Sequence, residues 1–208
     1  MLRNISLLSI FFLISAHVQL YAEPANLSLL KNEIVQYHDS GAYEKELASK
    51  INEVKSYLQK RVDDNQKLNK KQKLAIVLDI DETSLSNYEK MLRHGFYMNR
   101  AIFHQELLKS YSPAISPTLQ LYQYALAHHV SVFFVTGRDR SEQEITEKNL
   151  HWAGYDHWTA LYLRPDNYQQ PSIIPFKSSM REQISKQGYT IIASIGDQLS
   201  DIQGGYAE

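Results

Sequence analysis

Apolar positions follow two different patterns along this chain, one helical and one typical of buried strands. In the N-terminal part, five apolar residues recur at spacings of four, three, four and four: Leu47, Ile51, Val54, Leu58 and Val62. Such spacing places them on one stripe of a helix. Residues 27–71 are therefore predicted to be a helical extension, broken and capped near residues 39–41.

Four short apolar runs follow the extension, at residues 74–78, 130–135, 160–163 and 190–195. Each run is continuous rather than alternating, which is typical of a strand that is buried on both faces. Helical segments separate the runs. One of them is predicted to begin at a capping box of Ser141 and Glu144 and to end near Trp152, and another covers residues 177–186. Strands that alternate with helices predict an α/β fold with a Rossmann-like parallel sheet.

The first two strands are separated by residues 83–129, a segment that is too long for one crossover helix. Residues 100–110 and 118–129 have helical patterns, and two prolines lie between them. We predict that residues 84–117 form a small, mostly helical cap insertion over the edge of the sheet. Residues 118–129 would then be the true crossover helix.

The first 22 residues differ in character from the rest of the chain. A short basic start precedes an apolar run at residues 5–14, and Ala22 stands before a polar Glu-Pro pair. This order is typical of a cleavable signal peptide, whereas a membrane anchor needs about 20 apolar residues. We predict a signal peptide at residues 1–22 and one mature domain at residues 23–208. The protein is then exported, periplasmic or secreted, and has no membrane contact after cleavage.

Composition removes several classes of function. The chain has 208 residues, 22 basic and 23 acidic side chains and a net charge of −1, so its charge gives no reason to expect a nucleic-acid polymer as a partner. It contains no cysteine, which excludes disulfides, thiolate metal sites, a cysteine nucleophile and a lipid-anchored cysteine. We expect a small-molecule ligand, and the composition is compatible with a homo-oligomer.

Polar residues gather where the predicted strands end. Ligands of open α/β sheets bind outside the carboxyl ends of the strands, so side chains at these positions are expected to converge. The residues that follow the first, second and last strands, or open the helix before the last strand, are Asp79, Asp81, Thr136, Arg138, Lys177, Asp197 and Asp201. Four acids, one hydroxyl and one lysine are thus predicted to meet at one edge of the sheet, with Arg138 beside them.

Such a cluster of acids needs a counter-charge. Two carboxylates about 4 Å apart repel each other by roughly 4 kcal/mol at an effective dielectric constant of about 20, so converging carboxylates require a cation, a shared proton or both. No cysteine or histidine stands near these strand ends, and hard oxygen ligands favour Mg²⁺ over zinc. A metal with open positions attracts phosphate oxygens, for which Thr136 and Lys177 are natural partners. The residues therefore predict a site for a phosphate dianion beside an aspartate.

The segments 79–83, 136–138 and 196–201, together with Lys177, resemble the four signature motifs of the haloacid dehalogenase (HAD) superfamily. The longer stretches around these motifs are similar to the secreted acid phosphatases of its subfamily IIIB, the class B or vegetative-storage-protein-like branch. The likeness extends from residue 27 to the C-terminus. Members of the family generally continue past the last acidic motif, so we expect a further C-terminal segment that packs on the sheet.

The resemblance implies a two-step mechanism. Asp79 would be the nucleophile that attacks phosphorus and forms an aspartyl-phosphate. Asp81 would be the general acid and base, which protonates the leaving alcohol and then deprotonates the hydrolytic water. The family also implies that Mg²⁺ is held by the carboxylates of Asp79 and Asp197 and by the backbone carbonyl of Asp81.

The resemblance assigns supporting roles to the other residues. Lys177 and Thr136 would stabilise charge on the transferring phosphoryl group, and Asp201 would orient a metal-bound water or Lys177 from behind. For Arg138, a contact with phosphate and a structural salt bridge are both open. The start of the insertion is predicted to be a substrate-facing wall that stacks on an aromatic or base leaving group, formed by Asn87, Tyr88, Phe96 and Tyr97.

The sequence therefore predicts an exported, Mg²⁺-dependent phosphomonoesterase, an acid phosphatase, for small phosphate monoesters, with nucleotides as one candidate class. Two alternatives stay open. A response-regulator receiver domain also forms an aspartyl-phosphate among acids, a threonine and a lysine. A non-catalytic storage or phosphate-binding protein of the same fold is the second, although the presence of both Asp79 and Asp81 favours an active enzyme.

Overall fold

The computed structural model describes residues 26–206, and the predicted signal peptide at residues 1–22 lies outside this range. The helices are α1 (Leu27–Asp39), α2 (Ala42–Gln66), α3 (Tyr88–Arg93), α4 (Arg100–Lys109), α5 (Ser116–Ala127), α6 (Gln143–Trp152) and α7 (Ile174–Lys186). The strands are β1 (Lys73–Leu78), β2 (Ser131–Asp139), β3 (Ala160–Arg164) and β4 (Tyr189–Ile195). Within the described residues, no helix has the length and apolar character needed to cross a membrane.

The four strands form one parallel sheet in the order β3-β2-β1-β4, so β1 lies between β2 and β4. The register pairs Leu78 of β1 with Phe134 of β2 and with Ile195 of β4. This pairing brings the C-terminal ends of β1 and β4 together, with the end of β2 beside them. The α/β fold with a parallel sheet, predicted from the continuous apolar runs, is confirmed.

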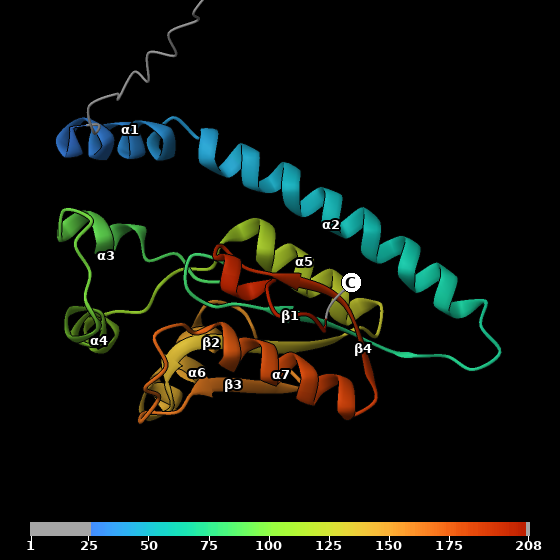
Figure 1. Ribbon diagram of the computed structural model, residues 1–208. Helices are drawn as coiled ribbons and strands as arrows, with labels where there is room; N and C mark the ends of the chain where they lie inside the picture. Colours follow the sequence, from blue (N-terminus) through green and yellow to red (C-terminus); the bar gives the residue numbers. More distant parts are fainter. Residues whose placement is uncertain (1–25, 207–208) are drawn as a thin grey trace, which may run out of the picture.

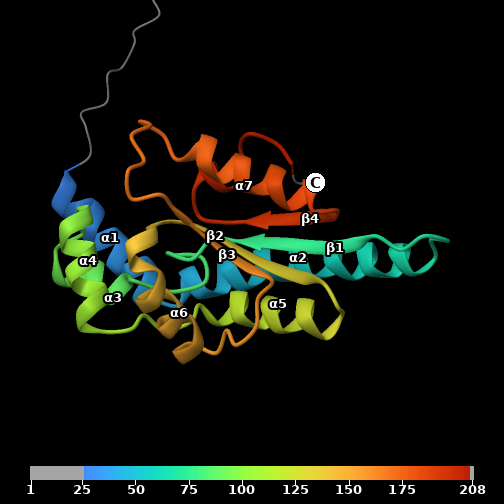
Figure 2. The same ribbon diagram turned by 90° about the horizontal axis from the view of Figure 1, so that it is seen from below.

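Helices cover both faces of the sheet, with α7 on one side and α2 and α5 on the other (Figures 1 and 2). Ile76 of β1 shares a core with Leu58 of α2 and Leu121 of α5. Its neighbour Val77 belongs to a second core with Phe176 of α7. Because successive strand side chains point to opposite faces, the continuous apolar run of β1 supplies both cores.

The start of α6 differs from the sequence prediction. The capping box predicted for Ser141 and Glu144 is wrong, because Asp139 and Glu142 form it two residues earlier. The backbone N–H of Asp139 donates to Glu142 Oε2 at 3.0 Å, and a 3-10 turn carries the chain from there into α6. Glu144 instead forms an i,i+4 ion pair with Lys148 on the surface of the helix.

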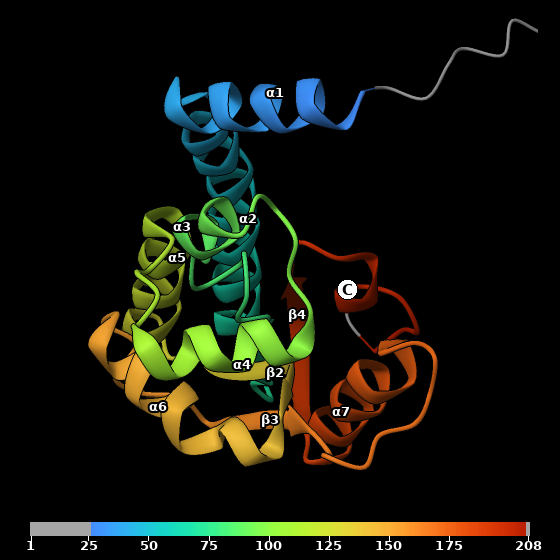
Figure 3. The same cartoon turned by 90° about the vertical axis from the view of Figure 1, so that its left-hand side faces the viewer.

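Helices α3 and α4 stand at the C-terminal end of the sheet, and α1 passes above α3 (Figures 1 and 3). His38 of α1 stacks on Tyr88 of α3, with ring centroids 3.4 Å apart. Arg100 of α4 pairs with Asp139 at the end of β2. The insertion between β1 and α5 is thus held in contact with the N-terminal helices above it and with the sheet below it.

Candidate active site

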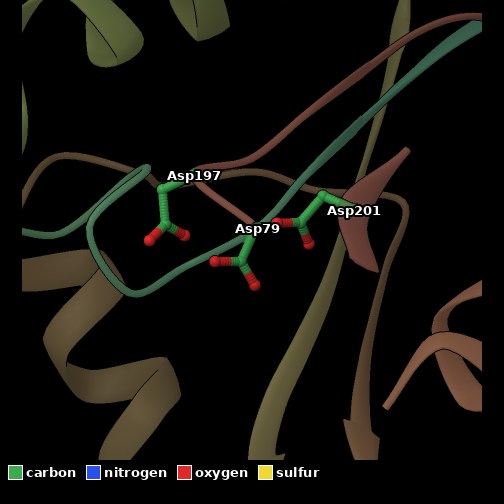
Figure 4. A group of neighbouring side chains, drawn as sticks. All are labelled: Asp79, Asp197 and Asp201. Carbon is green, nitrogen blue, oxygen red and sulfur yellow. The ribbon is translucent and has the colours of Figure 1, made fainter. Parts of the chain in front are cut away.

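Three aspartates meet at the C-terminal edge of β1 and β4. Asp79 directly follows β1, and Asp197 and Asp201 lie in the segment that follows β4. One carboxylate oxygen from each lies within 4.8 Å of the others, and Figure 4 shows the three carboxylates side by side. Asp79 and Asp201 are buried and Asp197 is exposed, so the cluster opens toward solvent on one side.

Lys177, in the first turn of α7, brings one positive charge to this cluster. Its Nζ donates to Asp79 Oδ1 at 2.7 Å and also to Asp201 Oδ1. Burial raises the pKa of Asp79 to about 7, with the charges of Asp201 and Asp81 adding to this effect and Lys177 opposing it. One lysine among these carboxylates therefore leaves the site with an excess of negative charge.

The cluster fits a divalent cation in both chemistry and shape. Its three groups are carboxylates, the hard oxygen donors that Mg²⁺ and Ca²⁺ prefer. Asp197 is exposed on one side, but the protein around it partly desolvates its carboxyl group and raises its pKa. A nearby positive charge would favour the ionised forms of both Asp79 and Asp197. A Cβ at Gly196 would overlap the carboxyl group of Asp201, so only glycine allows this close arrangement. The cluster can therefore hold a divalent metal ion.

Asp81 lies beside the cluster and is bound by two side chains. Arg138 donates to it through Nε, at 3.0 Å to Oδ2, and through Nη2, at 2.7 Å to Oδ1. Asn87 Nδ2 donates to Oδ1 at 2.9 Å. Burial acts to raise the pKa of Asp81, but Arg138 and Asn87 outweigh it and hold this pKa below its ordinary value. The Asp81 side chain keeps 28% of its surface exposed, so one side of it remains accessible.

Arg138 and Thr136 come from β2, the strand next to β1. The remaining amino group of Arg138, Nη1, donates to Thr146 Oγ1 of α6 at 3.2 Å. The guanidinium therefore donates to both Asp81 and Thr146, and it forms a salt bridge with Asp81. Thr136 is fully buried, and its Oγ1 accepts the backbone N–H of Arg138 at 3.2 Å.

A cavity of about 360 Å³ lies between the insertion and the N-terminal helices, and Asp197 is the aspartate of the cluster that lines it. Tyr88 and Phe96 of the predicted substrate wall line it. The other two residues of the predicted wall do not line the cavity. Asn87 is buried and donates a hydrogen bond to Asp81, and Tyr97 is 63% exposed. A larger hollow of about 850 Å³ between β3 and α7 contains none of the predicted site residues.

Sequence reasoning missed several residues of this cavity. Tyr37 and His38 of α1 and Tyr43 of α2 form its upper wall, and Glu82 lies in its floor beside Asp197. Burial raises the pKa of Glu82 to about 7. The three aromatic side chains precede the first motif by about 40 residues, so no local pattern connects them with it. Glu82 stands inside the first motif and has a positive φ of 57°, but its type alone does not distinguish it from a surface acid.

Comparison with known proteins agrees with this geometry. Residues 9–208 match the family model described as HAD superfamily, subfamily IIIB (acid phosphatase). The chain is 35% identical over 134 residues to the stem 28 kDa glycoprotein of Glycine max, covering 62% of this chain and 53% of that protein. It is 33% identical over 131 residues to acid phosphatase 1 of Solanum lycopersicum, covering 62% and 51%. The chain thus spans about half the length of the curated relatives it matches.

A solved structure has the same fold. The class C acid phosphatase from Bacillus anthracis superposes with a TM-score of 0.66 at 21% identity, covering 86% of this chain and 72% of that one. The shared fold includes the parallel sheet that carries the aspartates. The family predicted from the motifs is confirmed, and the chain belongs to subfamily IIIB of the HAD superfamily, the acid phosphatase subfamily.

Proposed function

We propose that the protein is a Mg²⁺-dependent phosphomonoesterase that works through an aspartyl-phosphate on Asp79. The observation that carries this proposal is the meeting of Asp79, Asp197 and Asp201 at the end of the central strand, with Lys177 bonded to two of them. Such a site offers a nucleophile, a place for a divalent cation and a positive charge for phosphate within one cluster. Membership of subfamily IIIB supports the same activity.

In the first step, a carboxylate oxygen of Asp79 attacks phosphorus, and the bond from phosphorus to the ester oxygen breaks. The electron pair of that bond leaves with the alcohol, which takes a proton from the carboxyl group of Asp81. Arg138 and Asn87 lower the pKa of Asp81 in the free site, and the negative charge of a bound phosphate would raise it again and so favour this acid form. Lys177 lies 2.7 Å from Asp79 Oδ1 and would stabilise the negative charge of the transferring phosphoryl group. The hydroxyl group of Thr136, in β2, would donate a hydrogen bond to a phosphoryl oxygen.

In the second step, Asp81 removes a proton from water, and the resulting hydroxide attacks the phosphorus of the aspartyl-phosphate. The bond between phosphorus and Asp79 breaks, which restores the carboxylate and releases inorganic phosphate. Arg138 and Asn87 donate hydrogen bonds to Asp81, so they would hold its carboxyl group in place through both steps. We therefore assign Arg138 to Asp81 rather than to the phosphate.

The metal would be held by the carboxylates of Asp79 and Asp197 and by the backbone carbonyl of Asp81. Asp201 accepts a hydrogen bond from Lys177 and would hold this lysine in position. When bound, Mg²⁺ supplies Lewis-acid stabilisation of charge on the phosphoryl oxygens.

The cavity beside Asp197 suggests the class of substrate. Its aromatic side chains, Tyr37, Tyr43, Tyr88 and Phe96, could pack against a planar leaving group. Its volume of about 360 Å³ is at the small end of the range for ligand pockets. We therefore propose small phosphate monoesters with aromatic leaving groups, nucleotides among them, as the preferred substrates.

We further propose that the protein is exported after removal of residues 1–22, and works in the periplasm or outside the cell. The basic start and short apolar run of this segment support the proposal. Expression of the whole coding sequence followed by N-terminal sequencing of the exported protein tests it. A mature N-terminus at Glu23 is expected, and retention of Met1 in a cell-associated protein would refute it.

The experiment that tests the activity compares wild type with Asp79→Asn on p-nitrophenyl phosphate, with Mg²⁺ and with a chelator. Release of nitrophenol is expected only for the wild type with Mg²⁺. Asp156→Asn is the matched control, because the Asp156 side chain is 67% exposed in the loop between α6 and β3 and none of its contacts involves the aspartate cluster. Undiminished release by Asp79→Asn would refute the proposed nucleophile.

A storage role is the second candidate, because the chain also resembles vegetative storage protein 1 of Arabidopsis thaliana, at 28% identity over 130 residues. A storage protein needs no intact site. Wild-type protein that folds, binds Mg²⁺ and releases no phosphate from any monoester would favour this alternative. A phosphoaspartate that forms once and is not hydrolysed would instead favour a receiver-like role.

A further inference from the structure

Lys90, in the short helix α3 of the insertion, is a buried cation without an acidic partner. Only 3% of its surface is exposed. Its Nζ donates to the backbone carbonyl of Ser110 at 2.8 Å and to Ser112 Oγ at 2.8 Å. In the described part of the chain, no carboxylate lies within ion-pair distance of Lys90. Burying an unpaired charge costs free energy, so this lysine calls for an explanation beyond packing.

The bonds from Lys90 continue to Asp81 through two buried side chains. Ser112 Oγ donates to Asn87 Oδ1 at 2.6 Å, and Asn87 Nδ2 donates to Asp81 Oδ1 at 2.9 Å. Ser112 is fully buried and Asn87 is 3% exposed. A continuous chain of hydrogen bonds therefore joins the insertion to Asp81.

The direction of this chain is fixed by Lys90. An ammonium group can only donate hydrogen bonds, so Ser112 must accept from Lys90 and use its single proton toward Asn87. Asn87 Oδ1 must then be the acceptor, which turns its amide NH₂ toward Asp81. Without the ammonium, the Ser112 hydroxyl and the Asn87 amide could reverse, and the amide oxygen would face the carboxylate.

The backbone holds both links of the chain in place. The Ser112 N–H donates to Asn149 Oδ1 at 2.9 Å, and Asn149 Nδ2 returns a bond to the Ser112 carbonyl at 2.7 Å. At the other link, the Asn87 N–H donates to Glu82 Oε1 at 2.6 Å. The two intermediate side chains thus have little freedom, and their orientation depends on which groups donate to them.

We propose that Lys90 is a positioning residue, which acts through Ser112 and Asn87 to orient the carboxyl group of Asp81 toward the leaving group. This inference rests on the proposed function, in which Asp81 protonates the leaving alcohol. Lys90 does not touch the substrate. It fixes the donor pattern in which Asn87 and Arg138 both donate to Asp81 Oδ1, and the exposed part of the Asp81 carboxyl group is left for the reaction.

The test uses Lys90→Met and Ser112→Ala, which interrupt the chain at different links, and two substrates. An alkyl phosphate depends on protonation of its leaving group, whereas nitrophenolate leaves readily without a proton. General acid catalysis contributes typically 10²–10⁴-fold. We expect both variants to lose about tenfold in kcat/KM on the alkyl ester and only about twofold on p-nitrophenyl phosphate. Ser112→Thr, which keeps the hydroxyl, should restore most of the alkyl activity.

Controls separate this inference from the proposed function. Asp81→Asn should show the same dependence on leaving group, only larger, and its failure to do so would refute the role of Asp81 itself. Suppose that Asp81→Asn shows this dependence, but Lys90→Met and Ser112→Ala each lose the same factor in kcat/KM on both esters. Lys90 is then only structural, and the inference is overturned. Lys109→Met, at an exposed lysine of α4, controls for surface charge on the insertion. Should Lys90→Met not fold, Ser112→Ala alone decides.

Discussion

Replacement of Arg138 by methionine tests how the proposed acid-base group is held. Methionine is unbranched and keeps much of the volume of the arginine stem, so the change removes the charge and the hydrogen-bond donors with little loss of packing. The Arg138 side chain is 1% exposed and its partner Asp81 is 28% exposed. Removing the arginine therefore leaves a largely buried carboxylate with Asn87 as its remaining side-chain donor.

The size of the effect follows from the bonds that are lost. Hydrogen bonds to charged groups contribute about 1.5–3 kcal/mol each, and breaking a fully buried ion pair costs about 3–5 kcal/mol. Because Asp81 keeps access to water, we expect a loss near the lower limit, about 2–3 kcal/mol in the free energy of unfolding. For a protein of this size, that corresponds to a decrease in Tm of about 4–12 °C. A misoriented Asp81 should also lower kcat by about 10–100-fold.

The assay combines thermal or urea unfolding with kinetics on an alkyl phosphate, and Arg164→Met is the matched control. Arg164 pairs with Asp139 at 2.7 Å, but both side chains are nearly one-fifth exposed and neither bonds to Asp81. This control should lose about 1 kcal/mol or less and keep most of its activity. If Arg138→Met folds as stably as wild type and keeps its kcat, or if Arg164→Met is equally impaired in kcat, the reasoning about Asp81 is wrong.

Three further predictions concern the metal cluster and the insertion. Gly196→Ala should abolish the increase in Tm that Mg²⁺ gives the wild type, because the added Cβ overlaps the carboxyl group of Asp201; an unchanged Mg²⁺ response would contradict this. Hydrogen bonds from Arg93 and Lys109 lower the pKa of Glu106 to about 2, so wild-type stability should decrease as the pH falls from about 4.5 to 2. In unfolding measurements, the free energy of unfolding of Glu106→Gln should depend less on pH between about 4.5 and 2 than that of the wild type. Burial lowers the pKa of Lys90 to about 8, and the unfolded chain then binds more protons between pH 8 and about 10.5. The free energy of unfolding of the wild type should therefore rise with pH across this range relative to that of Lys90→Met. The same pH dependence in both proteins would refute the lowered pKa of Lys90.

The strand ends were predictable because their signal is local. A continuous apolar run followed by Asp79, or by Asp197 and Asp201, specifies a buried parallel strand and the chemistry at its end. Since the ends of parallel strands share one edge of a sheet, the sequence was sufficient to predict that these acids meet. The predicted capping box lies two residues too late because the 3-10 turn before α6 is not visible in the apolar pattern.

The walls and supports of the site could not be predicted in this way. His38 stacks on Tyr88 only because α1 folds back over the insertion, and the sequence has no pattern that sets that crossing. Lys90 reads as an ordinary charge on a short helix, and its burial depends on how the loop at Ser112 is anchored by Asn149. The salt bridge between Arg138 and Asp81 likewise depends on side-chain geometry that the sequence does not specify.

The most direct test of the central claim is to trap the phosphorylated enzyme. In the Asp81→Asn variant, p-nitrophenyl phosphate should still phosphorylate Asp79, because its leaving group needs no proton, but hydrolysis of the intermediate should be slow. Rapid mixing with Mg²⁺ should then give a burst of nitrophenol equal to the enzyme concentration, and mass spectrometry after acid quench should find phosphate on Asp79. Turnover without a burst, or phosphate on another residue, would contradict the proposed mechanism.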